Sequence, residues 1–454
     1  MSLAAKPGRP LFAALALVGI AVAYIAMYAR AATLDVAYAD YLLPPFITAV
    51  DACMSGQDCL AALLAPTSNN YRWTVPVMLL SLNAKLFGLT TRFELVLGLA
   101  GLAIAALTLY VWLARVWIGA VSPAALLAAW LPCLFLLFNL NQWENIVLGI
   151  GAYHLLGIAA LLLCLSTIDR ALRAPKISMR RASTLFVALV GTSLFLLQYF
   201  VVLAVTATLL VLLARLAGQR GAFTVLATVL VASALGFVLT FVPASYSGQS
   251  APNVPGIGDL APVGRFFLNM LAAAMLQWEG KRVVADSGFL LGVPALIAFA
   301  MAVWLYVRQR MYETSWLPLA LCLYSLLVGV VVALSRFGYG AEYGFASRYT
   351  SQTALGFLGC YLILLKALQG RPQERGAIAM VAMLCVAVLL AQTATHVVQW
   401  SIAPYRQAYY GEVARIAAGF EEAQDEELIL FQVPVQAARQ ALPILRRHRL
   451  SFYR

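Results

Sequence analysis

The sequence predicts an all-α polytopic membrane protein, and three observations lead to this fold class. Of the 454 residues, 63% are hydrophobic and only 11% are charged, whereas about 25% of a typical soluble domain is charged. The mean hydropathy is +0.86. Apolar runs of about 20 residues, each sufficient to cross about 30 Å of hydrocarbon, recur along most of the chain. Together these observations exclude a water-soluble enzyme, a disordered chain and a disulfide-stabilised scaffold.

The apolar runs divide into about eleven predicted transmembrane helices. The first follows Lys6 and Arg9 without a convincing cleavage site, so we expect it to be retained as a span and not removed as a signal peptide. Residues 73–89 are also apolar, but we expect a surface helix there, because a further span would place the basic 169–181 loop outside. The predicted spans are 11–30, 93–115, 122–140, 146–167, 183–198, 200–217, 222–243, 287–307, 316–335, 350–367 and 376–397.

The distribution of Lys and Arg predicts the orientation of these spans. The net charge is +12, from 31 basic and 19 acidic residues. Basic residues gather in the connections 169–181, 215–220, 308–310 and 366–375, which the positive-inside rule assigns to the cytoplasm. The N-terminus is therefore expected in the cytoplasm and the C-terminus outside. Because this charge orients the spans, we expect no nucleic acid among the partners, whereas membrane lipids are expected.

Two parts of the chain are predicted. Residues 1–398 form a transmembrane module with two long outer loops, at 31–92 and 244–286, and surface helices in the first of them. The second loop opens with a Pro/Gly/Ser-rich stretch, 243–262, that is typical of irregular chain.

Residues 399–454 differ in composition and form a predicted C-terminal segment on the outer face. They contain an acidic cluster near 421–427 and a basic cluster near 446–449. Residues 428–433 have the pattern of a strand and residues 435–448 that of a helix, so an α/β arrangement is one option for this segment.

A few charged residues on the predicted outer face point to chemistry. Asp35 and Asp40 directly follow the first span, and a carboxylate at this place is able to accept a proton from an incoming hydroxyl. Arg336 and Arg348 lie in an outer connection, against the positive-inside bias, and guanidinium groups bind phosphate through paired hydrogen bonds. The alternatives are that the acids only make the loop soluble and that the arginines contact lipid phosphates in general.

Other residues give fewer functional signals. Cys53 and Cys59 share a polar outer loop, so we expect a disulfide there, the alternative being two free thiols on one helix. His154 lies in an apolar run and is expected to be an interior histidine, the alternative being a histidine that lines a cavity. The sequence has no His or Cys spacing of a metal site, no phosphate-binding loop and no dinucleotide fingerprint. We therefore expect no cofactor, and leave a divalent metal ion open.

Several short motifs follow one another on the predicted outer face. They are Tyr38-Ala39-Asp40 after the first span, Asn69–Arg72 before the surface helix, Gln142–Asn145 at the start of a span, and Arg336 with Ser347-Arg348-Tyr349. Their order resembles the GT-C superfamily of polytopic membrane glycosyltransferases, in particular the bacterial enzymes that use polyprenyl-phosphate sugars. Where the family has Asn-Glu-His-Arg, this chain has Asn69-Asn70-Tyr71-Arg72, which removes a second acid and an imidazole and shifts the acid–base role to Asp40.

The resemblance implies an inverting hexosyl- or pentosyltransferase in the bacterial inner membrane. It would move a sugar from a polyprenyl-phosphate donor to a glycan, lipid or protein acceptor at the periplasmic face, with Asp40 as general base and Asp35 as the second candidate. The other implied site residues are Arg336, Arg348 and Arg72 for the donor phosphate, and Glu144, Asn145, Asn70, Tyr349 and Trp143 for the sugar or acceptor. The alternatives are a flippase or exporter of lipid-linked glycans, and a GT-C-like ligase or polymerase that uses a diphosphate-linked donor.

Overall fold

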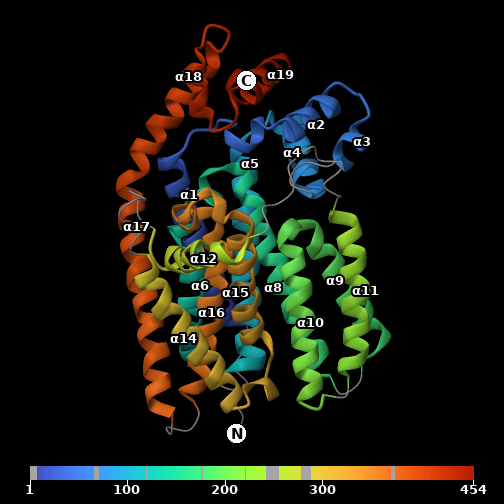
Figure 1. Ribbon diagram of the computed structural model, residues 1–454, viewed down its shortest axis with the longest axis vertical. Coiled ribbons are helices and arrows are strands. Elements are labelled where there is room, and N and C mark those ends of the chain that lie inside the picture. Colours follow the sequence, from blue (N-terminus) through green and yellow to red (C-terminus); the bar gives the residue numbers. More distant parts are fainter. Residues whose placement is uncertain are drawn as a thin grey trace.

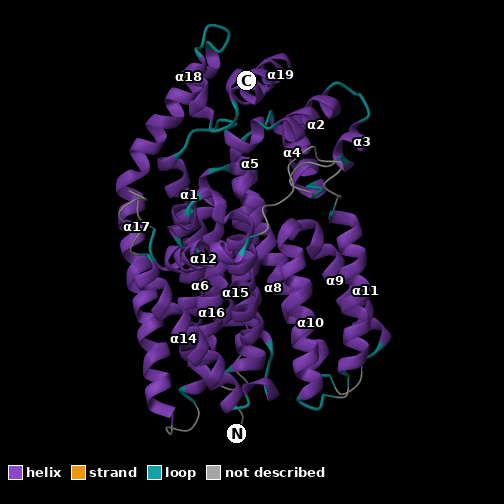
Figure 2. Cartoon of the chain, in the orientation of Figure 1, coloured by secondary structure: helices purple, strands orange, loops and turns teal. Residues whose placement is uncertain are grey.

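The computed structural model describes residues 8–65, 71–118, 121–174, 177–219, 221–241, 255–277, 288–369 and 374–454. Within these ranges the chain consists of helices and the turns that join them, with no β-strand (Figure 2). The predicted all-α fold is therefore confirmed.

Eleven helices coincide with the eleven predicted spans. Nine of them are long and apolar enough to cross a membrane, while α10 has only 17 residues and α16 starts with the polar run 350–353. The chain is thus a polytopic membrane protein. The eleven helices are α1 (Gly8–Ala32), α5 (Thr91–Trp112), α6 (Pro123–Leu137), α8 (Ala152–Leu172), α9 (Met179–Leu196), α10 (Phe200–Leu216), α11 (Ala222–Thr240), α14 (Phe289–Arg308), α15 (Leu317–Arg336), α16 (Thr350–Ala367) and α17 (Arg375–Ala418).

Short polar signals begin several of these helices. The Ser122 hydroxyl accepts a hydrogen bond from the backbone N–H of Ala125 at 3.2 Å, and Pro123 fills the first position of α6, where no N–H is needed. Ser178 caps α9 in the same way. A single 3-10 turn, Leu197–Tyr199, joins α9 to α10, in agreement with the one-residue gap between the predicted spans 183–198 and 200–217.

The connections with many basic residues lie at the end of the bundle where the described chain begins, opposite the C-terminus (Figure 1). Contacts between them show that they share this end. The Asp169 carboxylate accepts hydrogen bonds from the Ser315 hydroxyl at 2.8 Å and the Trp316 backbone N–H at 2.7 Å. Lys366 donates to the carbonyl oxygen of Trp117 at 3.0 Å. Their cytoplasmic orientation stays a prediction.

The opposite end carries the first outer loop and the C-terminal segment (Figure 1). The loop contains α2 (Pro44–Met54), α3 (Cys59–Leu64) and α4 (Thr74–Phe87), the last of which is the predicted surface helix. Cys53 and Cys59 form a disulfide with their Cα atoms 4.4 Å apart. This disulfide closes the turn between α2 and α3.

The C-terminal segment is helical throughout, so the α/β option for it is wrong. Helix α17 runs without a break through the expected boundary at 398–399. The predicted strand 428–433 instead continues from α18 (Asp425–Leu428) into a 3-10 turn, Ile429–Phe431, and α19 (Val435–Arg447) follows. Two features favour the start of a helix here. The first turn of α18 contains three acidic residues, and the Glu427 carboxylate accepts a hydrogen bond from the Gln424 backbone N–H.

The second outer loop contains a helix that the sequence does not predict. Helix α12 (Leu260–Met275) lies across the direction of the long helices (Figure 1). Its Phe266 and Met270 side chains are buried against the bundle. The expectation of an irregular loop therefore fails for 260–262, whereas 243–254 lies outside the described residues.

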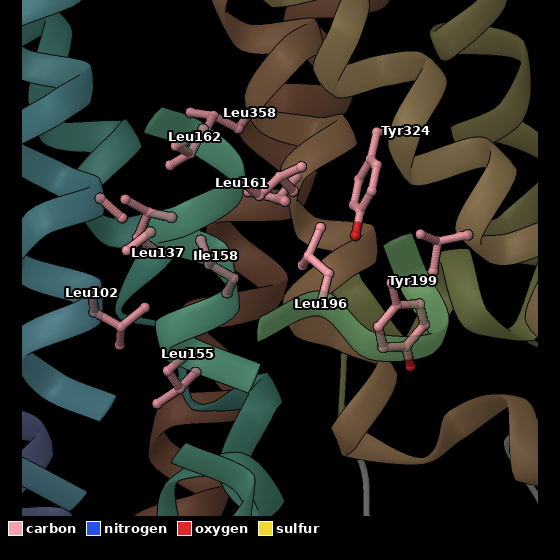
Figure 3. Packing of buried hydrophobic residues seen from close by; sticks show 14 of the residues in the cluster. Leu102, Leu137, Leu155, Ile158, Leu161, Leu162, Leu196, Tyr199, Tyr324 and Leu358 are labelled. Atoms are coloured by element: carbon pink, nitrogen blue, oxygen red, sulfur yellow. The ribbon is translucent and has the colours of Figure 1, made fainter. Parts of the chain in front are cut away.

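The core is centred on the contact between α5 and α8. Leu102 of α5 and Leu137 of α6 face a row of α8 residues that includes Leu155 and Ile158 (Figure 3). Gly101 lets α5 approach α8 closely, since a Cβ on it would lie 2.9 Å from both the Leu155 carbonyl oxygen and the Leu156 Cα. This packing fixes the start of α8, which contributes to the cavity described below.

The close contact at Gly101 is testable. Gly101→Ala is expected to lower the free energy of unfolding by about 1–3 kcal/mol, because backbone atoms cannot yield to the added methyl group. Gly191→Ala in α9 is the matched control, since nothing lies within 4 Å of its added Cβ, and alanine there adds about 0.5–1 kcal/mol of stability. Unfolding of the detergent-solubilised protein measures both, and equal stability of the two variants would contradict the packing.

Candidate functional site

A cavity of about 320 Å³ lies where the first outer loop meets the helix bundle, and we call it the Asp40 cavity. Four of the sequence-predicted site residues line it together, namely Asp40, Arg336, Arg348 and Tyr349. Residues more than 300 positions apart in the sequence thus share one cavity. The full lining is Asp40, Leu43, Phe46, Trp73, His154, Tyr199, Arg336, Tyr339, Tyr343, Arg348 and Tyr349.

The Asp40 carboxylate has no hydrogen bond or ion pair with any of the described residues. It lies in a 3-10 turn, Ala39–Leu42, which follows the non-helical stretch 33–38 after α1. Burial raises the pKa of Asp40, and Glu144 raises it further, while Arg348 and Arg336 act in the opposite direction. An unpaired carboxylate with a raised pKa is suited to accept a proton.

Asp35, the second candidate base, is used to anchor the chain. Its carboxylate accepts hydrogen bonds from the Thr91 backbone N–H and the Thr90 hydroxyl, both at 2.7 Å, and from the Arg454 guanidinium at 2.6 Å. Burial alone would raise the pKa of Asp35, but these donors outweigh it and hold the pKa below its usual value. Asp35 does not line the Asp40 cavity.

Further anchors fix the backbone between Asp35 and Asp40. The Ala37 backbone N–H donates to the Ser451 hydroxyl at 2.6 Å, so the C-terminal segment holds this stretch directly. The Tyr38 and Tyr409 hydroxyls lie 3.2 Å apart, within hydrogen-bonding distance. Ala39 adopts a φ of +52°, which is uncommon for a residue with a side chain. The surrounding contacts therefore hold a strained turn immediately before Asp40.

On the other side of Asp40, Tyr41 is held by a fully buried carboxylate. Its hydroxyl donates to Glu94 in the first turn of α5. Glu94 also accepts from Asn83 of α4 at 3.0 Å and from Tyr153 of α8 at 3.3 Å. Gly149 is required here, since a Cβ on it would overlap the Tyr41 hydroxyl and the Glu94 carboxylate. Glu94 thus joins the Asp40 turn to α4 and α8.

The two arginines of the cavity come from the connection between α15 and α16. The Arg336 guanidinium lies 5.5 Å from the ring centre of Tyr339, and that of Arg348 lies 6.0 Å from the ring of Tyr349. Half of the Arg348 side chain is exposed. Two guanidinium groups in one partly open cavity create a site for an anionic group.

The α7 helix (Trp143–Val147) positions Arg348. The Glu144 carboxylate accepts from the Arg348 backbone N–H at 2.9 Å and lies 3.8 Å from its side-chain Nε. The Asn145 amide donates to the Arg348 carbonyl oxygen and the Ser351 hydroxyl, each at 3.2 Å. Glu144 and Asn145 therefore act through Arg348, and neither lines the Asp40 cavity.

Trp143 and Arg72 do not line the Asp40 cavity. Trp143 packs face to face against the Arg406 guanidinium, 3.7 Å from its ring centre. Arg72 is joined to the end of α11, because its backbone N–H donates to the Thr240 carbonyl oxygen at 2.8 Å and its side chain donates to that of Val238 at 3.3 Å. Asn70 lies outside the described residues.

Several residues of the cavity were not identified from the sequence. For His154 the alternative holds and not the expected interior position, since it lines the cavity together with Trp73 and Tyr199. The polar motif 141–145 does not line the cavity and instead hydrogen-bonds Ser347, Arg348 and Ser351. The turn at Tyr199 is visible in the sequence as a gap between two spans, but this gap does not indicate that Tyr199 lines the Asp40 cavity.

The described ranges contain a second cavity but no cluster of candidate metal ligands. No group of three or more His, Cys, Asp or Glu side chains that could hold a metal ion occurs in the described ranges. A second cavity of about 520 Å³ lies between α1, α5 and α7, with Arg30, Arg92, Asp35 and Gln407 among its lining residues. It shares no lining residue with the Asp40 cavity.

Comparison with known proteins gives one structural likeness. No family model matches the sequence, and no curated protein matches it. The solved structure of ArnT from Cupriavidus metallidurans in the apo state is similar over 93% of this chain and 85% of that chain, with 14% identity and a TM-score of 0.44. The functional assignment below therefore rests on the residues of the Asp40 cavity.

The anchoring of Tyr41 is testable by removing one oxygen atom. Tyr41→Phe is expected to lower the free energy of unfolding by about 1–3 kcal/mol, because the buried Glu94 carboxylate loses a hydrogen-bond donor. Tyr405→Phe is the control, since Tyr405 on α17 is 78% exposed and should change stability little. If both variants unfold at the same denaturant concentration, Glu94 does not hold the turn.

Proposed function

We propose that this protein is a membrane glycosyltransferase of the GT-C type, which transfers a sugar from a polyprenyl-phosphate donor to an acceptor hydroxyl. The observation that supports this most is the meeting of an unpaired carboxylate, Asp40, with two guanidinium groups, Arg336 and Arg348, in one cavity. A sugar transfer needs both, since a base must take the acceptor proton while positive charge stabilises the leaving phosphate. The order of the family motifs supports the same assignment.

The reaction in this proposal is a single displacement. Asp40 accepts the proton of the acceptor hydroxyl as its oxygen forms a bond to the anomeric carbon of the sugar. The bond between that carbon and the phosphate oxygen breaks on the opposite face, so the configuration inverts. The polyprenyl phosphate leaves with the bonding electron pair, and Arg336 and Arg348 stabilise its additional negative charge.

The supporting residues fit these roles. Glu144 and Asn145 bind the backbone of Arg348 on both sides, so they orient the guanidinium group and do not bind the sugar. Glu94 and Ser451 hold the turn that carries Asp40. Preorganised charges of this kind need no rearrangement during the reaction, which is the main source of electrostatic catalysis.

The location of the cavity supports action at the outer face of a bacterial inner membrane. Asp40, Leu43, Phe46 and Trp73 of the first outer loop line the cavity. This loop lies at the end of the bundle that carries the C-terminus, opposite the basic connections assigned to the cytoplasm (Figure 1). The Cys53–Cys59 disulfide at that same end fits an oxidising compartment such as the periplasm. The acceptor class, whether glycan, lipid or protein, is open in this proposal.

Replacement of the base tests the proposal. Asp40→Asn is expected to lower kcat by about 10²–10⁴-fold, because the amide cannot accept the proton. Asp58→Asn is the matched control, since Asp58 only caps α3 on the same loop and asparagine caps equally well. The rate is measured as release of undecaprenyl phosphate from a panel of its sugar-linked forms, in liposomes supplied with a membrane extract as acceptor source.

Two outcomes would contradict the assignment. A wild-type rate in Asp40→Asn would exclude Asp40 as the base. If the protein uses only diphosphate-linked donors, the assignment changes to a ligase or polymerase. Two guanidinium groups also suit a diphosphate.

The pH dependence gives a second test. Asp40 is active when deprotonated, so the rate falls as the pH falls through its pKa, and burial places this acid limb above that of an ordinary aspartate, whose pKa is about 3.9. Arg336→Gln removes a charge that lowers this pKa and should move the limb to higher pH. Glu144→Gln removes a charge that raises it and should move the limb to lower pH. Shifts in the same direction would contradict Asp40 as the titrating group.

A further inference from the structure

Three aromatic side chains of the Asp40 cavity have no role in the reaction described above. They are Trp73 just before α4, His154 in the first turn of α8, and Tyr199 between α9 and α10, and we call them the aromatic wall. The ring centres of Trp73 and His154 lie 6.5 Å apart and those of His154 and Tyr199 lie 6.1 Å apart. The three rings thus pack edge to face in one row, with the imidazole in the middle.

His154 is the unusual member of this wall. Among the described residues, no group forms a hydrogen bond with either of its ring nitrogens. A neutral imidazole carries one donor and one acceptor, and such groups are almost always paired when they are removed from water. Because His154 lines the cavity, a bound ligand is able to supply the missing partner.

The wall differs in character from the part of the lining that holds the arginines. Arg336 and Arg348 lie beside Tyr339 and Tyr349 on the connection between α15 and α16. The aromatic wall comes from three other elements and carries no formal negative or guanidinium charge. The cavity therefore offers one region for an anion and a second region for a ligand with an apolar face and hydroxyl groups.

We propose that the aromatic wall binds the sugar ring of the donor, with His154 as hydrogen-bond partner of one of its hydroxyl groups. This rests on the proposed function and deepens it. Sugar rings present C–H groups on their faces and hydroxyl groups at their edges, so aromatic side chains cover the face while a donor–acceptor group reads the edge. A polar group that the bound ligand shields from water also discriminates strongly, because a sugar that lacks the matching hydroxyl leaves it unpaired.

The same proposal moves sugar recognition away from the residues that the motif resemblance implies. The Asn145 amide is already engaged with Arg348 and Ser351. The Trp143 ring is covered by Arg406. Among the described members of that group, Tyr349 alone lines the cavity, and its ring lies beside the Arg348 guanidinium. In this proposal His154 recognises the sugar hydroxyl, because the Asn145 amide and the Trp143 ring are engaged elsewhere.

Equilibrium binding to two probes tests the proposal on the full-length protein in nanodiscs. One probe is undecaprenyl phosphate, and the other is a panel of its glucose-, mannose- and arabinose-linked forms. The wild type is expected to bind at least one sugar-linked form more tightly than undecaprenyl phosphate. His154→Ala should lose about tenfold in affinity for that form, with affinity for undecaprenyl phosphate unchanged, and His154→Gln should recover part of the loss.

Arg336→Ala is the matched variant in the arginine-containing part of the cavity. It should lower the affinity for both probes. Equal weakening of both probes by His154→Ala, or no effect on either, would overturn the proposal for the aromatic wall and leave the proposed function standing. A wild type that prefers no sugar-linked form would do the same. Failure of the wild type to bind any of the probes would instead contradict the proposed function itself. The unfolding temperature of each variant separates these results from a loss of folded protein.

Discussion

The buried carboxylate of Glu94 holds together the segments that surround Asp40. Its hydrogen bonds join Tyr41 of the Asp40 turn, Asn83 of α4 and Tyr153 of α8. A carboxylate with no exposed surface is costly to leave unpaired, so each of these donors contributes to keeping the three segments in register. Tyr41 adjoins Asp40 and Tyr153 adjoins His154, so the position of two cavity residues depends on this one group.

The C-terminal segment supplies the second constraint. Helix α17 extends well beyond the predicted span and carries the chain back over the first outer loop (Figure 1). There Ser451 binds the Ala37 backbone and Arg454 binds Asp35, while His448 lies 2.7 Å from Asp51 of α2. Asp40 is thus held between a membrane helix on one side and the last residues of the chain on the other. Both constraints leave its own carboxylate unpaired and directed into the cavity.

The sequence predicts the parts of this arrangement that depend on local pattern. The apolar runs predict all eleven helices of the bundle, and the charge distribution predicts that Arg336 and Arg348 lie at the same end as Asp40. The choice between Asp35 and Asp40 depends on contacts with Thr90 and Arg454, which are 55 and 419 positions away from Asp35. Contacts over such sequence separations cannot be predicted from a local sequence pattern. In the same way, His154 in an apolar run is indistinguishable from a packed histidine until the helices are assembled.

The central claim is that Arg336 and Arg348 hold the lipid phosphate within reach of Asp40. The most direct measurement is an electron cryo-microscopy structure of the protein with bound undecaprenyl phosphate. The account predicts the phosphate in the Asp40 cavity, within hydrogen-bonding distance of both guanidinium groups, with Asp40 still unpaired. A phosphate bound instead in the cavity between α1, α5 and α7, beside Arg30 and Arg92, would contradict it.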